Sequence, residues 1–122
     1  MEIFRDFDFE AAHFLPGVPD GHKCKRMHGH SYRVRVHIRG TPGGPQKWVM
    51  DFADVKRIVS AVLDRLDHRV LNEIPGLENP TAEQIARYLW RELTPGLPGL
   101  SKIVLRETAK AGCIYRGEDE DR

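Results

Sequence analysis

The chain has 122 residues, of which 40% are hydrophobic and 30% charged, and its formal net charge is +1. This composition is typical of one globular domain, and the near-neutral charge argues neither for nor against a polyanionic partner. No apolar run approaches the roughly 20 residues of a membrane-spanning helix, and the first residues lack the pattern of a signal peptide. We therefore expect one domain over residues 1–118, a charged, disordered tail over 119–122, no membrane or nucleic-acid partner, and a cytoplasmic location.

The two cysteines, Cys24 and Cys113, are too few for a disulfide framework. They favour free thiols in a reducing compartment, and a bridge between them is the less favoured alternative. Cys113 lies in an apolar run, so we expect it to be a small core residue.

Two segments in the first third of the chain alternate between apolar and polar residues, which is the pattern of a half-buried strand. In residues 3–14 one face carries Phe7, Phe9, Ala11 and His13, and the other carries Asp6, Asp8 and Glu10. In residues 30–40 the two faces carry Tyr32, Val34, Val36 and Ile38, and Arg33, Arg35, His37 and Arg39. Taken alone, the residues favour solvent exposure for this basic face over the wall of a polar channel between subunits.

Two amphipathic segments follow, and each begins with a residue that commonly caps helices. Asp51 caps a helix that we expect to end near Asp67-His68, and Thr81, with Gln84 in the capping-box position, caps the second. The expected buried positions are Phe52, Val55, Val59, Val62, Leu63 and Leu66 in the first helix and Ile85, Tyr88, Leu89 and Leu93 in the second.

Two more strands are predicted, one from the apolar run 103–105, finishing at residues 106–108, and one over residues 113–115. The resulting order, β-β-α-α-β-β, predicts an α+β fold in which the two helices cover one face of a four-stranded antiparallel sheet. No internal repeat and no linker interrupts this order.

A closely spaced histidine pair indicates a metal site. His28 and His30 are two residues apart, so in extended backbone both side chains lie on the same face. His13 stands at the end of another predicted strand. Three imidazoles suit a zinc ion that keeps its fourth position open, which is the catalytic arrangement. We therefore predict a Zn²⁺ site at His13, His28 and His30, whereas His22 and His37 are expected to be ordinary polar residues.

Cys24 lies close to this pair and admits three interpretations. As a fourth zinc ligand it would close the site and make it structural. As a buried thiol it would be inert. As a thiolate stabilised by Lys23, Lys25, Arg26 and the metal it would be reactive. The polar and cationic neighbours count against the buried interpretation.

Two further positions place a charge at the end of an element. Asp67-His68 ends the first predicted helix, where the residues alone favour a helix terminus over a carboxylate that orients an imidazole for proton transfer. Glu107 follows an apolar strand and would be partly buried. A buried carboxylate needs a partner, and a pair of N–H groups on a ligand would supply one.

With these positions in view, the chain resembles the bacterial 6-carboxytetrahydropterin synthases, relatives of 6-pyruvoyltetrahydropterin synthase. The resemblance covers residues 4–118 and is carried by Phe9–His13, Cys24 with His28–His30, Asp51-Phe52, Leu66–His68, Asn79–Glu83, and Glu107-Thr108 ahead of Tyr115. Only three residues separate Cys24 from His28, which is more similar to the carboxy branch than to the pyruvoyl enzymes of animals.

The resemblance implies the tunnelling fold, in which subunits form a trimeric barrel and two trimers stack into a homohexamer. The basic face of residues 30–40 would then line the tunnel rather than face bulk solvent. The resemblance also assigns roles: Zn²⁺ ligands at His13, His28 and His30, a general base at Cys24, a proton relay at Asp67 and His68, and a pterin anchor at Glu107. We place Thr81, Lys23 and Arg26 among the substrate-binding residues, with Lys25 and Arg116 as further candidates for the triphosphate.

The activity that the resemblance implies is that of a lyase acting on 7,8-dihydroneopterin triphosphate. The products would be 6-carboxytetrahydropterin, acetaldehyde and triphosphate, in an early step toward queuosine and other 7-deazapurines. One alternative is a pyruvoyl synthase with the same site and a different product. The other is a non-catalytic zinc-binding oligomer in which Cys24 completes a closed site.

Overall fold

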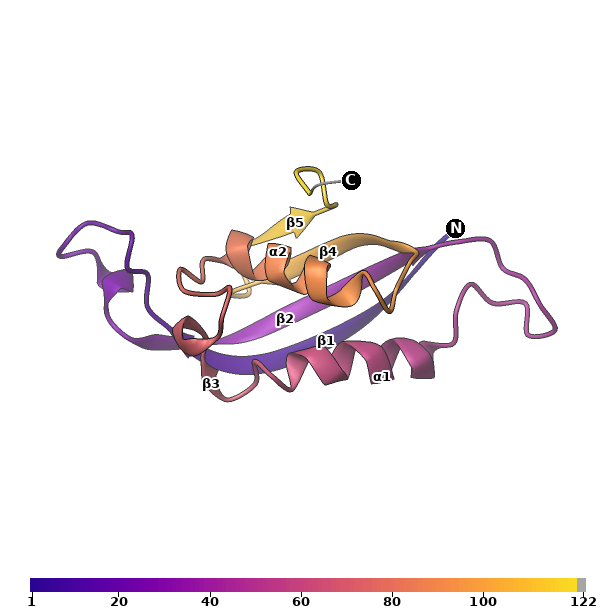
Figure 1. The fold of residues 1–122 in the computed structure, drawn as a ribbon, viewed down its shortest axis with the longest axis horizontal. Helices are drawn as coiled ribbons and strands as arrows, with labels where there is room; N and C mark the ends of the chain where they lie inside the picture. Colours follow the sequence, from indigo (N-terminus) through magenta and orange to yellow (C-terminus); the bar gives the residue numbers. More distant parts are fainter. Residues whose placement is uncertain (121–122) are drawn as a thin grey trace.

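Two long strands form the centre of the fold in the computed structural model, which describes residues 1–120. Strands β1 (Glu2–His13) and β2 (His28–Arg39) pair antiparallel along their whole length (Figure 1). Strand β4 (Leu100–Arg106) pairs with the far edge of β2, and β5 (Gly112–Tyr115) pairs with β4, both antiparallel. The connection between β1 and β2, with its short 3₁₀ turn η1 (Lys23–Lys25), and the connection after β2 project from opposite ends of the sheet (Figure 1).

A fifth strand corrects the expected four-stranded antiparallel sheet. Strand β3 (Arg69–Val70) lies on the outer edge of β1 and runs parallel to it, so that the sheet order is β3-β1-β2-β4-β5. Two residues are too few to show an alternating pattern, and their pairing depends on the direction of the chain after the preceding helix. The four longer strands and the α+β class are as the sequence predicted.

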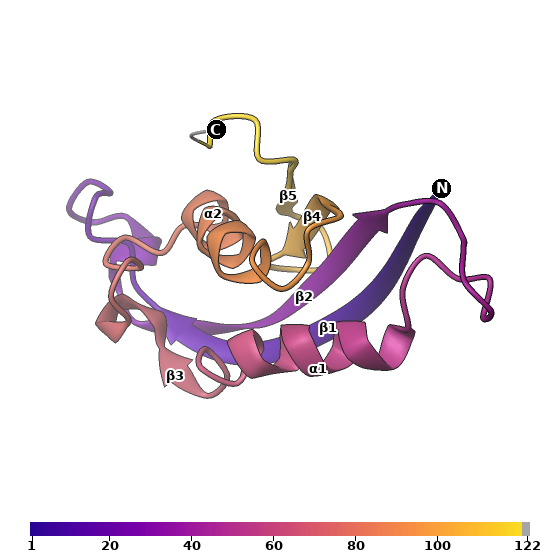
Figure 2. The same cartoon turned by 45° about the vertical axis from the view of Figure 1, so that its right-hand side comes forward.

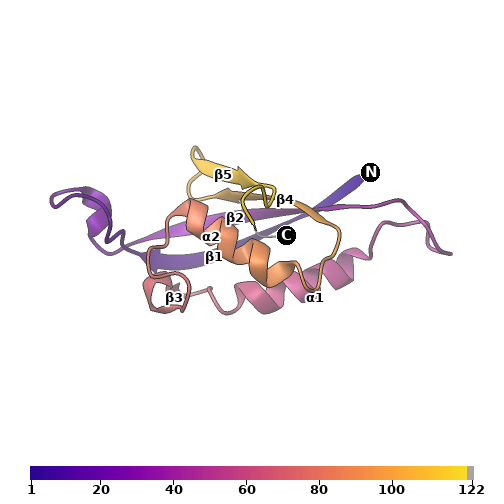
Figure 3. The same cartoon turned by 45° about the horizontal axis from the view of Figure 1, so that its top comes forward.

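Both helices lie on the face of the sheet that carries the apolar side chains. Helix α1 (Phe52–Leu63) packs against β1, and α2 (Ala82–Leu93) packs against β4 and β5. The sheet curves around α2 while α1 runs alongside β1 (Figure 2; Figure 3). One contiguous core joins the two layers, and its largest fully buried side chains include Phe9, Tyr32, Leu66, Leu89 and Ile103.

The predicted helix caps are confirmed. The Asp51 carboxylate accepts a hydrogen bond from the backbone N–H of Ala53 at 2.9 Å, and the Thr81 hydroxyl accepts one from that of Gln84 at 3.2 Å. Each cap satisfies one of the backbone donors that the first helical turn leaves unpaired. Each cap sets the residue at which its helix begins, and the helical repeat then determines which of the following residues face the core.

Three details of the helix predictions were wrong. Helix α1 ends at Leu63, and turns continue to Asp67 before the chain reverses. Phe52, the first residue of α1, was expected in the core and is 49% exposed. Tyr88 is only partly buried, and Ala86 takes its place in the buried stripe of α2.

The reversal after α1 depends on His68, whose backbone adopts a left-handed conformation with φ 58°. This conformation is uncommon for residues other than glycine. It lets the His68 N–H donate to the carbonyl of Glu10 at 2.6 Å, and the two residues that follow pair with β1 as β3. The reversal therefore brings Asp67 and His68 to the outer edge of β1.

The chain beyond β5 packs against α2. Asp119 forms an ion pair with Arg87, and Glu120 pairs with Arg91 at 3.1 Å and accepts a hydrogen bond from the Tyr115 hydroxyl at 3.0 Å. The tail predicted to be disordered is thus ordered at its first two residues, and 121–122 lie outside the described residues. Within residues 1–120, neither α-helix has the combined length and apolar character needed to cross a lipid bilayer.

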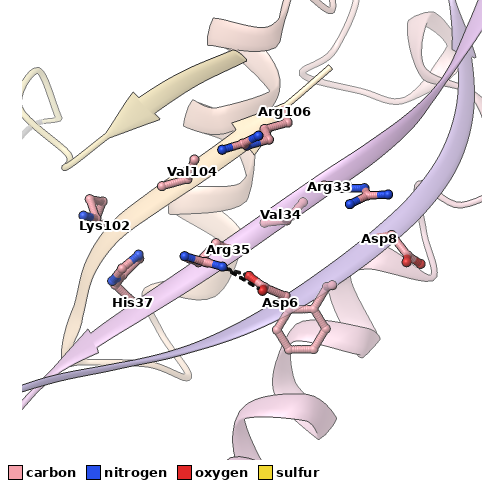
Figure 4. A pocket seen from close by; sticks show the side chains of 10 residues that line it. Asp6, Asp8, Arg33, Val34, Arg35, His37, Lys102, Val104 and Arg106 are labelled. Atoms are coloured by element: carbon pink, nitrogen blue, oxygen red, sulfur yellow. Dashed lines mark hydrogen bonds and ion pairs between the residues drawn. The ribbon is translucent and has the colours of Figure 1, made fainter. Parts of the chain in front are cut away.

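The face of the sheet opposite the helices carries charged side chains. It forms a depression of about 660 Å³ lined by Asp6 and Asp8 from β1, Arg33, Arg35 and His37 from β2, and Lys102 and Arg106 from β4 (Figure 4). Arg35 and Asp6 are opposite each other in the β1–β2 register and form a two-pronged ion pair, with N–O distances of 2.7 and 2.9 Å (Figure 4). We call this charged surface the outer face.

Candidate metal centre

Three histidines meet at the end of the β1–β2 pair, on the side covered by the helices. The register places His13 directly opposite His28, and His30 opposite Ala11. One ring nitrogen from each histidine lies within 4.8 Å of those of the other two. The ring centroids are 4.6, 5.0 and 4.9 Å apart for the His13–His28, His13–His30 and His28–His30 pairs. His13, His28 and His30 are therefore a cluster with the dimensions of a metal site, and we call them the triad.

Backbone carbonyls fix the orientation of two triad rings. Nδ1 of His13 lies 2.8 Å from the carbonyl oxygen of Pro80, and Nδ1 of His28 lies 2.7 Å from that of Arg26. A carbonyl oxygen can only accept, so each Nδ1 carries the hydrogen and each Nε2 keeps its lone pair. Metal-binding histidines in proteins are typically held in this way by their second nitrogen.

His30 provides the strongest indication that the triad holds a cation. Its Nε2 is buried and has no hydrogen-bond partner in the described part of the chain. The Glu107 carboxylate lies 3.3 Å away, but its direction does not make a hydrogen bond. Leaving a buried polar atom unsatisfied costs about 1–3 kcal/mol, and coordination to a metal ion would remove that cost. The donor set of three imidazoles fits a Zn²⁺ ion with an open fourth position.

Burial also favours the protonation state that binds metal. Removal from water lowers the pKa of His13, which is completely inaccessible, and the nearby negative charge of Glu107 only partly offsets this effect. Burial lowers the pKa of His30 in the same way. An imidazole must be neutral to donate its lone pair, so both shifts keep the ligands available at neutral pH.

Tyr32 is a neighbour of the triad that sequence reasoning assigned only to the core. Its ring stacks on Phe9 at 4.8 Å, and its hydroxyl lies 3.3 Å from Nδ1 of His13. Burial raises the pKa of this hydroxyl, which therefore stays protonated. The i, i+2 spacing from His30 could have indicated its place, because alternate residues of a strand share a face. No local signal could have indicated the carbonyls of Pro80 and Arg26.

Cys24 lies in η1, close in sequence to the triad but not part of its ligand cluster within residues 1–120. Its side chain is half-buried, and its backbone carbonyl accepts a hydrogen bond from the N–H of Leu15 at 2.8 Å. This bond ties the loop to the end of β1, two residues beyond His13. The thiol is free, as is that of Cys113, which packs against the core as predicted.

The cationic residues around Cys24 differ in their partners. Lys25 is bound to Asp20 at 2.7 Å and to the carbonyl of Val18. Lys23 and Arg26 are exposed, and the structure records no ion pair for either among the residues it describes. These two side chains remain able to bind an anion. His22 and His37 lie outside the triad.

Asp67 and His68 contact each other beyond the end of α1. The Asp67 carboxylate lies 2.9 Å from Nδ1 of His68 and accepts the backbone N–H of Glu10, also at 2.9 Å. The Glu10 N–H, and to a lesser degree His68, holds the pKa of Asp67 below its usual range. His68 and His30 line one shallow depression of about 440 Å³ along the β1 edge. Asp67 can thus orient the exposed His68 ring from one side.

Glu107 and Thr81 occupy different parts of the site. Glu107, partly buried as predicted, follows β4 and faces the triad from His30's side. Thr81 uses its hydroxyl oxygen to cap α2, one residue after the Pro80 carbonyl that holds His13. The structure therefore brings Glu107 to the metal centre and gives Thr81 a structural contact beside it.

Comparison with known proteins gives the family. Residues 2–118 match the family described as 6-pyruvoyl tetrahydropterin synthase. The chain belongs to this family. A relative from Synechocystis, named 6-carboxy-5,6,7,8-tetrahydropterin synthase, is 41% identical over 119 residues, which is 93% of this chain and 91% of the relative. The dihydroneopterin monophosphate aldolase of Pyrococcus furiosus is 35% identical over 95 residues, covering 78% of this chain and 76% of the relative.

A solved structure from Caenorhabditis elegans has the same fold. This 6-pyruvoyl tetrahydropterin synthase superposes with a TM-score of 0.89 at 30% identity, covering 97% of this chain and 96% of that chain. The chain is therefore an enzyme of this family, and its triad lies on the family's α+β scaffold.

Proposed function

We propose that the chain is a zinc-dependent 6-carboxytetrahydropterin synthase. It would convert 7,8-dihydroneopterin triphosphate to 6-carboxytetrahydropterin, acetaldehyde and triphosphate, on the route to queuosine and other 7-deazapurines. The observation that carries the proposal is the triad, with its unsatisfied His30 Nε2 and the Glu107 carboxylate 3.3 Å from that atom. The 41% identity to a relative of that name supports the choice of reaction.

His13 and His28 would hold Zn²⁺ through the Nε2 atoms that their carbonyl partners leave free, and His30 through its unsatisfied Nε2. When bound, the ion supplies Lewis acidity toward the vicinal hydroxyls of the substrate side chain. The absence of Cys24 from the ligand cluster in residues 1–120 supports a catalytic site with an open position over a closed structural site.

The remaining roles belong to side chains of this chain. Glu107 would accept two N–H groups of the pterin and thereby fix the ring beside the metal, since carboxylates bind such pairs bidentately. The Cys24 thiolate would remove a proton from the substrate side chain, which the bound pterin ring places beside the metal. His68, oriented by Asp67 at 2.9 Å, would carry a second proton. Orientation can lower an activation barrier by roughly 7–11 kcal/mol. We expect this positioning to supply several kcal/mol of that total.

The triphosphate would be bound by Lys23 and Arg26, the cations beside Cys24 without a recorded partner in residues 1–120. Lys25 is a weaker candidate because Asp20 already occupies its ammonium group. Thr81 would contribute through its hydroxyl hydrogen, since its oxygen already accepts the helix-capping bond.

We propose that the enzyme works in the cytoplasm as a homohexamer of two stacked trimers, with the outer face lining the central tunnel. Two features support assembly through the sheet edges. The edge strands β3 and β5 are short and leave backbone groups open for pairing with another chain, and Ile114 on β5 is 53% exposed. Light scattering after size-exclusion chromatography, at decreasing protein concentration, measures the assembly directly.

The test of the reaction is incubation with 7,8-dihydroneopterin triphosphate, followed by mass identification of the pterin and trapping of acetaldehyde. Atom balance requires one water for the carboxy product and none for the pyruvoyl product, so the two pterins differ in composition and mass distinguishes them. A zinc chelator should abolish turnover, and added Zn²⁺ should restore it.

Each other product corresponds to a different function. A pyruvoyl pterin without acetaldehyde would assign the pyruvoyl reaction. A hydroxymethyl pterin with a glycolaldehyde phosphate would assign an aldolase, the activity named for the Pyrococcus furiosus relative. No turnover by a zinc-loaded hexamer would leave the non-catalytic zinc oligomer as the function.

A further inference from the structure

Asn72 makes a set of contacts around His13 that neither the fold nor the proposed reaction explains. It lies in the second short 3₁₀ turn, η2 (Leu71–Glu73), just after β3. Its side-chain Oδ1 accepts the backbone N–H of Phe14 at 3.0 Å, and its Nδ2 donates to the Phe14 carbonyl at 2.8 Å. One side-chain amide thus occupies both hydrogen-bonding groups of the residue that follows His13.

These two bonds extend the pairing of β1 past the end of its backbone partner. Strand β3 pairs with Ala11 and Ala12, and then the chain turns away from the sheet. The amide of Asn72 continues the ladder at Phe14 in the manner of a backbone peptide. His13 is therefore fixed on its outer edge by contacts to the residues on both sides of it, and on its inner edge by pairing with His28.

The same amide also reaches the loop that supplies the acceptor for the His13 ring. Nδ2 of Asn72 lies 3.4 Å from the carbonyl of Glu78, two residues before Pro80. The Pro80 carbonyl accepts the His13 Nδ1–H at 2.8 Å and so determines the direction of Nε2. Asn72 is therefore linked to His13 in two indirect ways. It binds the backbone of Phe14, the residue after His13, and it contacts the loop whose Pro80 carbonyl holds the His13 ring.

We propose that Asn72 is a positioning residue of the candidate metal centre. By binding the Phe14 backbone and the Glu78 carbonyl, it holds His13 and the loop carrying Pro80 at the separation that directs Nε2 of His13 toward the other two ligands. The inference rests on the proposed metal site but not on the pterin reaction. Partners that orient a metal ligand typically contribute roughly 10- to 100-fold to metal affinity. Asn72 would act one contact further from the metal than such a partner. Its amide carries the donor and the acceptor on separate atoms, so it can bind the N–H and the carbonyl of Phe14 at the same time.

The test compares Zn²⁺ affinity in the full-length protein, measured by competition with a chromogenic chelator. The variants are Asn72→Asp, which keeps the shape but loses both donors, and Asn72→Ser, which is smaller and retains one hydroxyl. Gln46→Glu is the control, because it makes the same amide-to-carboxylate change at an exposed side chain in the connection after β2, away from the triad. We expect the Zn²⁺ dissociation constant to rise roughly 10- to 100-fold in both Asn72 variants and to stay unchanged in Gln46→Glu.

A purely structural role for Asn72 gives a different result. Folded Asn72 variants, identified by circular dichroism well below their melting temperatures, would then bind Zn²⁺ with wild-type affinity, and the proposal would be wrong. Failure of both variants to fold, with Gln46→Glu folding normally, would likewise assign Asn72 to stability alone. Co²⁺ in place of Zn²⁺ gives a second readout, because a displaced His13 should change the visible absorption of the bound ion.

These measurements separate this inference from the proposed reaction, since none of them uses a pterin. Loss of metal affinity in the Asn72 variants of a protein without synthase activity would uphold the inference and overturn the reaction. A wild-type chain that binds no Zn²⁺ would overturn the metal centre and the inference together.

Discussion

The two faces of strand β2 carry the same residue type in opposite surroundings. His30 lies on the face covered by the helices, where its Nε2 is buried and the nearest charged group is the carboxylate of Glu107 at 3.3 Å. His37 lies on the outer face, opposite Lys102 in the β2–β4 register. Burial lowers the pKa of both imidazoles, but Glu107 opposes this shift at His30 whereas Lys102 adds to it at His37.

This difference indicates why only one face can hold a metal. A carboxylate beside an imidazole attracts a cation, and removal of water strengthens that attraction. A lysine beside an imidazole repels a cation, and exposed charges are screened by water and salt. The outer face therefore pairs charges in exposed contacts such as Asp6–Arg35, while on the covered face Nε2 of His30 has no hydrogen-bond partner within residues 1–120.

The largest expected effect is the loss of a metal ligand. It is tested by replacing His30 and His37 with alanine in separate variants. His30→Ala should weaken Zn²⁺ binding by more than the roughly 100-fold that loss of an outer partner can cause, because a direct ligand is removed. Turnover should fall with the metal. His37→Ala, the matched change on the outer face, should leave Zn²⁺ content by atomic absorption and turnover near wild type. Equal losses in both variants would contradict the assignment of the metal to the covered face.

Cys24→Ala should separate metal binding from catalysis. Loss of a general base lowers turnover by roughly 100- to 10,000-fold, and the Zn²⁺ content should not change because Cys24 is not in the ligand cluster described for residues 1–120. Cys113→Ala is the control for loss of a thiol elsewhere. If Cys24→Ala instead released the metal, the closed-site interpretation would be correct.

Glu107→Gln should reduce kcat/KM by about 10- to 100-fold, since a hydrogen bond to a charged group contributes about 1.5–3 kcal/mol. The change keeps the shape of the side chain and removes the charge that we propose pairs with the pterin N–H groups. Zn²⁺ affinity should change much less than kcat/KM. The opposite pattern would place Glu107 in the metal centre rather than in the pterin site. Glu92→Gln, at a surface ion pair with Arg65, serves as the control.

The smallest effect is expected on the outer face, from Asp6→Asn. The Arg35 guanidinium holds the pKa of Asp6 below its usual value of 3.8, so the ionised carboxylate stabilises the folded state above that pH. This stabilisation should disappear as the pH falls through the lowered pKa of the folded state. The melting temperatures of metal-free wild type and Asp6→Asn should therefore differ slightly at neutral pH and converge in acid.

Asp8→Asn is the comparison for this titration. Asp8 lies opposite Arg33 in the register, but among the described residues it makes no recorded ion pair. A pH-dependent difference as large for Asp8→Asn as for Asp6→Asn would mean that the general field of the outer face, rather than the Asp6–Arg35 pair, is responsible.

Much of this arrangement follows from local patterns in the sequence. Alternation separated His28 and His30 from the arginines of the same strand, because strand side chains point to opposite faces in turn. Asp51 and Thr81 marked both helix starts because a side-chain oxygen there meets an unpaired backbone N–H. These signals depend on residues only a few positions apart, so the sequence contains them completely.

What the sequence determined by itself was the composition of each face: which strand residues are covered, which are charged, and which two imidazoles stand together. Only the tertiary structure decided that His13 lies opposite His28 and that the carbonyl of Pro80 orients the His13 ring. The same holds for the contact of Asn72 with Phe14, the residue after His13. It also decided that β3 exists, since those two residues pair only because His68 reverses the chain. The reason is physical: periodicity assigns a side chain to a face, but partners far apart in sequence are set by strand register and chain reversals, which no local pattern encodes.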